Sequence, residues 1–67
     1  MLTQRKTELL KTLVGEYIGS ASPVPSETVA KKHPRGVSSA TVRNEMAHLE
    51  EEGYITRPHH SAGAVPL

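Results

Sequence analysis

Hydrogen-bonding side chains cluster at the start of one predicted helix. Within residues 36–46, a turn of small residues leads into a helix whose early positions include Ser39, Thr41, Arg43 and Asn44. Side chains of these types form hydrogen bonds with the phosphate oxygens and base edges of DNA. A helix that only packs against its neighbours would favour better helix formers than Ser and Thr. The segment is therefore typical of the turn and recognition helix of a helix-turn-helix.

The helical period separates an inward face of this helix from an outward face. At about 100° per residue, one side carries the apolar residues Val42, Met46 and Leu49. The small Ala40 on the opposite side lets that face lie close to a groove floor. There Asn44 can bond adenine, and Arg43 can bond guanine or a phosphate. The predicted base-reading set is Ser39, Ala40, Thr41, Arg43 and Asn44, and a plain solvated helix face is the alternative.

Positive charge is concentrated beside this helix, although the net charge of the chain is only +1. Residues 31–43 contain basic but no acidic side chains, whereas residues 45–52 contain acidic side chains and no Lys or Arg. We therefore expect the N-terminal end of the helix to enter the groove, with phosphate contacts around it. The predicted phosphate-contacting residues are Lys31, Lys32, Arg35, Ser38, Arg57, His59 and His60. A solvated turn of mixed charge is the alternative.

Three helices are predicted to position these residues. The first covers about residues 3–18, is capped by Thr3 and ends in the segment 19–23, which is rich in Gly and Ser. The second covers about residues 26–33 with a Ser26 cap, and the third covers about residues 38–52 with a Ser38 cap and a stop at Gly53. The apolar stripe of the first helix consists of Leu9, Leu10, Leu13, Val14, Tyr17 and Ile18, and Val29 and Ala30 face inward on the second.

The remaining segments have strand character. Val24 lies between two prolines and can make at most a short edge-strand contact. Residues 54–67 predict a hairpin, with a first strand closed by Pro58, a turn and a short return strand. A hairpin directly after a recognition helix is a wing. The predicted fold is mainly α with a small β-hairpin, a winged helix-turn-helix forming a single domain over residues 1–67.

Composition argues against several other classes of protein. The 67 residues include no Cys, which excludes a disulfide scaffold or thiolate zinc site and fits the cytoplasm. The apolar runs are too short for a membrane span. The serines lack a base and an orienting group, so neither an enzyme nor a cofactor is expected. The four histidines, His33, His48, His59 and His60, could suggest a metal site. Such a site is disfavoured because the side chains of His59 and His60 would point in different directions on a strand.

Several motifs together resemble the N-terminal DNA-binding domain of the bacterial heat-inducible repressor family HrcA. The most specific are the block Gly-Val-Ser-Ser-Ala-Thr-Val-Arg-Asn-Glu-Met at residues 36–46 and Pro-His-His-Ser-Ala-Gly at residues 58–63. Matching blocks at residues 2–5, 16–18, 23–26 and 49–54 extend the resemblance over nearly the whole chain. The resemblance implies a repressor of chaperone operons that binds double-stranded DNA at an inverted-repeat operator as a homodimer.

The chain departs from the family pattern at two points. It stops at Leu67, where family members continue into a dimerisation and sensing region, so we expect a monomeric piece of a longer repressor. It also has Ala64 where the family commonly has a basic residue, which shifts the expected wing contact toward Arg57 and the turn. The competing interpretation from another class is a winged-helix module for protein interaction, because a fold does not determine a function. The basic stretch at residues 31–43 argues against it.

Overall fold

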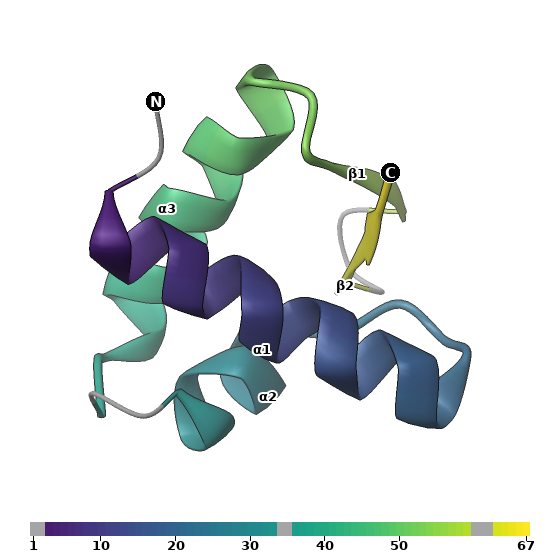
Figure 1. The fold of residues 1–67 in the computed structure, drawn as a ribbon, viewed down its shortest axis with the longest axis horizontal. Coiled ribbons are helices and arrows are strands. Elements are labelled where there is room, and N and C mark those ends of the chain that lie inside the picture. Colours follow the sequence, from purple (N-terminus) through teal and green to yellow (C-terminus); the bar gives the residue numbers. More distant parts are fainter. Residues whose placement is uncertain (1–2, 34–35, 60–62) are drawn as a thin grey trace.

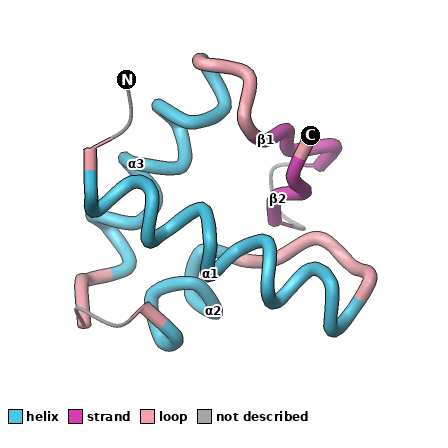
Figure 2. Tube along the Cα trace, viewed as in Figure 1, coloured by secondary structure: helices cyan, strands magenta, loops and turns pink. Residues whose placement is uncertain are grey.

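Three helices and one antiparallel hairpin form the fold, as Figure 1 shows in the computed structural model, which describes residues 3–33, 36–59 and 63–67. The helices are α1 (Gln4–Ser20), α2 (Ser26–Lys32) and α3 (Ser39–Glu51), and the strands are β1 (Ile55–His59) and β2 (Gly63–Pro66). Helix α1 crosses α2 and α3, and the hairpin lies to one side of α3 (Figure 2). The predicted fold class, a mainly helical winged helix, is confirmed.

Helix α1 begins as predicted and ends later than predicted. The Thr3 hydroxyl caps it by accepting a hydrogen bond from the Lys6 amide at 3.1 Å. The helix continues through Gly19 and ends at Ser20; its C-cap Ala21 has a left-handed φ of 55° and donates its amide to the Tyr17 carbonyl. Ile18 was predicted to face inward but is 77 % exposed. The prediction that Ile18 belongs to the buried stripe is wrong, because the last turn of α1 extends past the elements that cover Leu9 and Leu13.

Helix α2 does not use the predicted cap. Its N-cap residue is Pro25, whose φ of −68° and ψ of 152° place the chain in an extended conformation, and no side chain bonds the helix start. Ser26 is already helical, and its hydroxyl lies 3.3 Å from the Glu27 carboxylate. The Ser26 cap is therefore wrong, because proline sets the entry of the chain one residue earlier. At the other end, the helix stops at Lys32, and His33 is extended and buried.

The hairpin is attached to the helices through Val24. Val24 and Ala64 exchange backbone hydrogen bonds of 2.8 and 3.0 Å, which confirms the predicted edge contact. Within the hairpin, Thr56 pairs with Val65 and His59 with Gly63, and the register shifts between these pairs. Pro58 lies inside β1 and does not close it, which corrects the prediction. The irregular register accommodates a residue that has no amide hydrogen.

The core is formed by apolar residues from every element. Its buried members are Leu9, Leu13, Val24, Val29, Val42, Met46, Leu49, Ile55 and Ala64. Partly buried Leu10, Tyr17, Ala30 and Val37 pack against them. These residues cover α3 on one side only and leave its other side to solvent.

Across the described ranges, no helix is both long and apolar enough to span a membrane.

Candidate nucleic-acid interface

The start of α3 is held by its own cap. The Ser38 hydroxyl accepts a hydrogen bond from the Thr41 amide at 3.2 Å and lies 3.1 Å from the Thr41 hydroxyl. Ser38 is exposed, whereas Thr41 and Ser39 are half-buried. Capping thus occupies hydroxyl groups that the sequence assigned to DNA. Ser38 keeps access to a phosphate, but Thr41 is less available to bases than its position on a helical wheel suggests.

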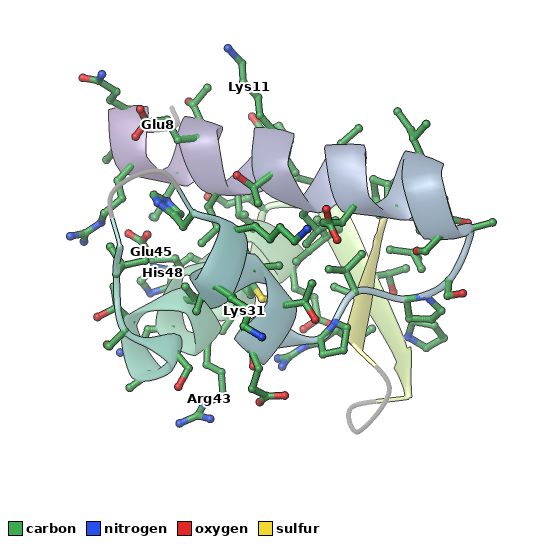
Figure 3. The ribbon with its side chains drawn as sticks, turned by 90° about the horizontal axis from the view of Figure 1, so that it is seen from below. Glu8, Lys11, Lys31, Arg43, Glu45 and His48 are labelled. Atoms are coloured by element: carbon green, nitrogen blue, oxygen red, sulfur yellow. The ribbon has the colours of Figure 1, made fainter. Side chains whose placement is uncertain are left out.

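The outward face of α3 is open. Ala40, Arg43 and Asn44 are exposed, while Val42 and Met46 on the opposite side are buried. Figure 3 shows Arg43 pointing away from α1, on the same side of the molecule as Lys31 of α2. The fold therefore brings a predicted phosphate contact and a predicted base contact to one face. This face, containing Lys31, Ala40, Arg43 and Asn44, is called the α3 face below.

Two other predicted phosphate contacts are engaged in ion pairs. Lys32 Nζ lies 3.7 Å from Glu16 Oε2 of α1, so this lysine reaches toward α1. Arg57 Nε of β1 donates to Glu50 Oε1 of α3 at 3.0 Å. The Arg57 side chain as a whole is 27 % exposed. Neighbouring lysines of α2 thus have different surroundings, and Lys31 is the better candidate for DNA.

Three predicted phosphate contacts cannot be compared with the structure in full. Arg35 and His60 fall outside the described residues, and for His59 only the backbone is described. Ala64, the position where the family commonly has a basic residue, is fully buried beside Val24. Its side chain faces the interior of the domain and cannot contact a phosphate in this arrangement. His48 is exposed on α3, whereas His33 is buried after α2.

An ion pair that the sequence did not predict lies beneath the α3 face. Arg5 Nε of α1 donates to Glu45 Oε2 of α3 at 2.9 Å, and the Glu45 side chain is only 8 % exposed. The spacing contained a signal for it, because Glu45 lies three residues after Val42 and four before Leu49 on the inward stripe. An acidic residue at such a position is easily assigned to the surface, since unpaired carboxylates are rarely buried.

Curated relatives match nearly the entire chain. A heat-inducible transcription repressor HrcA from Acetivibrio thermocellus is 57 % identical over 65 residues, which are 97 % of this chain and 18 % of the relative. The HrcA of Parafrankia sp. is 54 % identical over 66 residues, or 98 % of this chain and 20 % of the relative. The chain is homologous to the N-terminal domain of HrcA. It spans about one fifth of the length of these HrcA proteins.

A solved structure has the same fold. The crystal structure of a hypothetical protein superposes with a TM-score of 0.89 at 45 % identity and covers 97 % of this chain and 21 % of that one. No protein-family model matches the chain. Homology to HrcA therefore rests on the curated relatives, and the arrangement of α3 and the hairpin is shared with a solved protein.

Proposed function

We propose that this chain binds double-stranded DNA in a sequence-specific manner through the α3 face and the hairpin, as the DNA-binding part of a bacterial heat-shock repressor. The observation that supports it best is the exposure of Arg43 and Asn44 on the side of α3 opposite its buried stripe. Such a helix inserts its N-terminal residues into the major groove. The names of the relatives, heat-inducible transcription repressors, support the regulatory role. A location in the cytoplasm is part of the proposal.

The roles divide by chemistry within the proposed interface. Asn44 bonds a base edge, and Arg43 bonds a base edge or a phosphate, because an amide and a guanidinium match the groove patterns of adenine and guanine. Ala40 lets the helix approach the bases. Lys31, Ser38 and Arg57 bind phosphates. The proposed operator is an inverted repeat read by two copies, as the HrcA resemblance implies.

The salt dependence of binding to duplex DNA tests the proposal. We expect the affinity of the chain for a labelled duplex, measured by fluorescence anisotropy, to fall steeply with salt because bound phosphates release counterions. Lys31→Ala should weaken binding to all duplexes and reduce the slope of log K against log salt by about 0.9. An absence of binding even at low salt would instead favour a module for protein interaction.

A matched control separates this contact from net charge. Lys11 is exposed on α1 and points away from the α3 face (Figure 3). Lys11→Ala removes the same charge as Lys31→Ala but should leave the slope unchanged. Equal slopes for both variants would contradict the assigned orientation of the DNA.

A further inference from the structure

A carboxylate is buried directly beneath the proposed reading residues. Glu45 follows Asn44 in α3, and its side chain lies on the side that faces α1, whereas Arg43 points the opposite way (Figure 3). Its Oε2 accepts the 2.9 Å hydrogen bond from Arg5 Nε, and within the described part of the chain its buried Oε1 has no hydrogen-bond partner. Arg5 is therefore a charged partner of this buried carboxylate.

The pair joins two helices that share little other contact. Helix α3 packs more extensively against α2 and β1 than against α1. A directional bond from a guanidinium to a carboxylate restricts both the distance and the roll of one helix relative to the other. Because Glu45 is adjacent to Asn44, a small roll of α3 at this point changes where Asn44 and Arg43 project.

The energetics of buried ion pairs favour a geometric role. Desolvation of two charges commonly cancels their attraction, so apolar replacement of both partners is often neutral or stabilising. In some proteins a buried polar pair instead specifies one arrangement among several of similar stability. In the present pair only the Glu45 side chain is buried, at 8 % exposed, while the Arg5 side chain is 52 % exposed, so the desolvation cost falls mainly on the carboxylate.

We propose that Arg5 is a positioning residue for DNA recognition: by holding Glu45 it sets the orientation of α3, although Arg5 itself does not touch DNA. This inference rests on the proposed function. Loss of the pair lets α3 occupy orientations that cannot bind. Apparent affinity then falls in proportion to the binding-competent fraction, so a fraction of one tenth weakens binding about 10-fold.

The first experiment measures the orientation of α3 without DNA. The chain has no Cys, so spin labels attach only to cysteines introduced at exposed Lys11 of α1 and exposed His48 of α3. We expect a narrow distance distribution by pulsed electron resonance for the parent chain and a broader or shifted one for Arg5→Met with Glu45→Met. An unchanged distribution would overturn the proposal, whether or not the chain binds DNA.

The second experiment measures binding of unlabelled variants to a duplex selected from a random pool by the parent chain. The double variant should remain folded by circular dichroism, lose affinity about 10-fold and keep the parent salt slope, since no phosphate contact is removed. A slope reduced by about 0.9 would mean that Arg5 binds a phosphate directly, and unchanged affinity would mean that the pair does not affect recognition. Either result overturns the proposal.

Single variants complete the test. Glu45→Gln keeps the side-chain shape and removes the charge, so it serves if the double variant does not fold. Glu45→Gln and Arg5→Met should each weaken binding, and their combination should be no weaker than either alone, because both break one interaction. Additive effects would contradict the coupling. Failure of the parent chain to bind any duplex would reject the proposed function, while the distance measurement still decides the position of α3.

Discussion

Adjacent residues of α3 have opposite environments, and this contrast underlies both proposals. Arg43 and Asn44 are exposed, whereas Val42, Glu45 and Met46 are buried. A helix turns by about 100° per residue, so exposure at one position and burial at the next follow from a single orientation. Changes on the exposed side should therefore affect recognition, and changes on the buried side should affect stability.

Replacing Asn44 with Ala should reduce sequence preference more than overall affinity. A lost bidentate contact to a base costs about 1–3 kcal/mol of discrimination, while contacts to phosphates remain. Competition between a selected duplex and random DNA measures the difference. Gln4→Ala, which removes an exposed amide at the start of α1, is the control and should change neither quantity. Equal weakening of Asn44→Ala on both DNAs would argue against base reading.

Replacing Met46 with Ala should destabilise the fold before it affects recognition. Met46 is 1 % exposed at the centre of the buried stripe, and truncation of a buried side chain of this size costs about 2–5 kcal/mol. Chemical denaturation measures the loss of unfolding free energy. Ile18→Ala is the matched control, because Ile18 is 77 % exposed and should cost little. A stable Met46→Ala variant with poor DNA binding would show that the faces of α3 are reversed.

At the scale of elements, ion pairs and one backbone bridge set how the pieces meet. Arg5–Glu45 joins α1 to α3, and Arg57–Glu50 joins the hairpin to α3. The bridge between Val24 and Ala64 joins the hairpin to the segment before α2. The position of the hairpin relative to α3 thus depends on one contact of each strand, the ion pair of Arg57 in β1 and the bridge of Ala64 in β2.

The Val24 bridge requires a glycine beside it. Gly63 has a φ of +106°, and a Cβ there would overlap the Val24 carbonyl group and lie 2.7 Å from the Pro25 nitrogen. Gly63→Ala should therefore lower the unfolding free energy by clearly more than the about 1–2 kcal/mol that a left-handed φ alone costs, and should detach the hairpin. Thermal melting and amide exchange at Val24 measure these effects.

Gly36→Ala is the matched control for the hairpin experiment. Gly36 also has a positive φ, +63°, but apart from its chain neighbours a Cβ there meets no atom of the described residues within 4 Å. Gly36→Ala should lower the unfolding free energy only by the strain of a left-handed backbone, about 1–2 kcal/mol. Equal losses for both variants would show that the close approach to Val24 does not matter.

At the scale of the whole molecule, we expect this chain by itself to be a monomer. Its exposed large apolar residues, Ile18, Tyr54 and Leu67, do not form a helical seam comparable to the buried stripe of α1. The proposed operator has two half-sites, so a single copy should bind weakly.

Joining two copies after Leu67 through a neutral dimeriser should strengthen binding to an inverted repeat by about 10²–10⁴-fold, because the second contact becomes intramolecular. The gain should depend on half-site spacing, since both recognition helices must meet the same side of the duplex. Titration of inverted repeats with varied half-site spacing measures this dependence. A fused dimer no better than the monomer at every spacing would argue against the paired operator.

Local chemistry made most of the fold and the outward face predictable from the sequence. The Thr3 and Ser38 caps and the spacing of the Val42–Met46–Leu49 stripe depend on neighbours within a few residues. Such interactions are encoded by residue type and spacing. The exposure of Arg43 and Asn44 follows from the same stripe.

Only the tertiary structure decided which positions of a periodic stripe are covered and which charges are paired. Ile18 continues the stripe of α1 but lies beyond its covering elements, and Glu45 is buried because Arg5, forty residues earlier, reaches it. Lys31 and Lys32 differ in the same way, since Glu16 of α1 lies within reach of Lys32. Burial and ion pairing are properties of what lies opposite a residue, and the sequence specifies that only through the assembled fold.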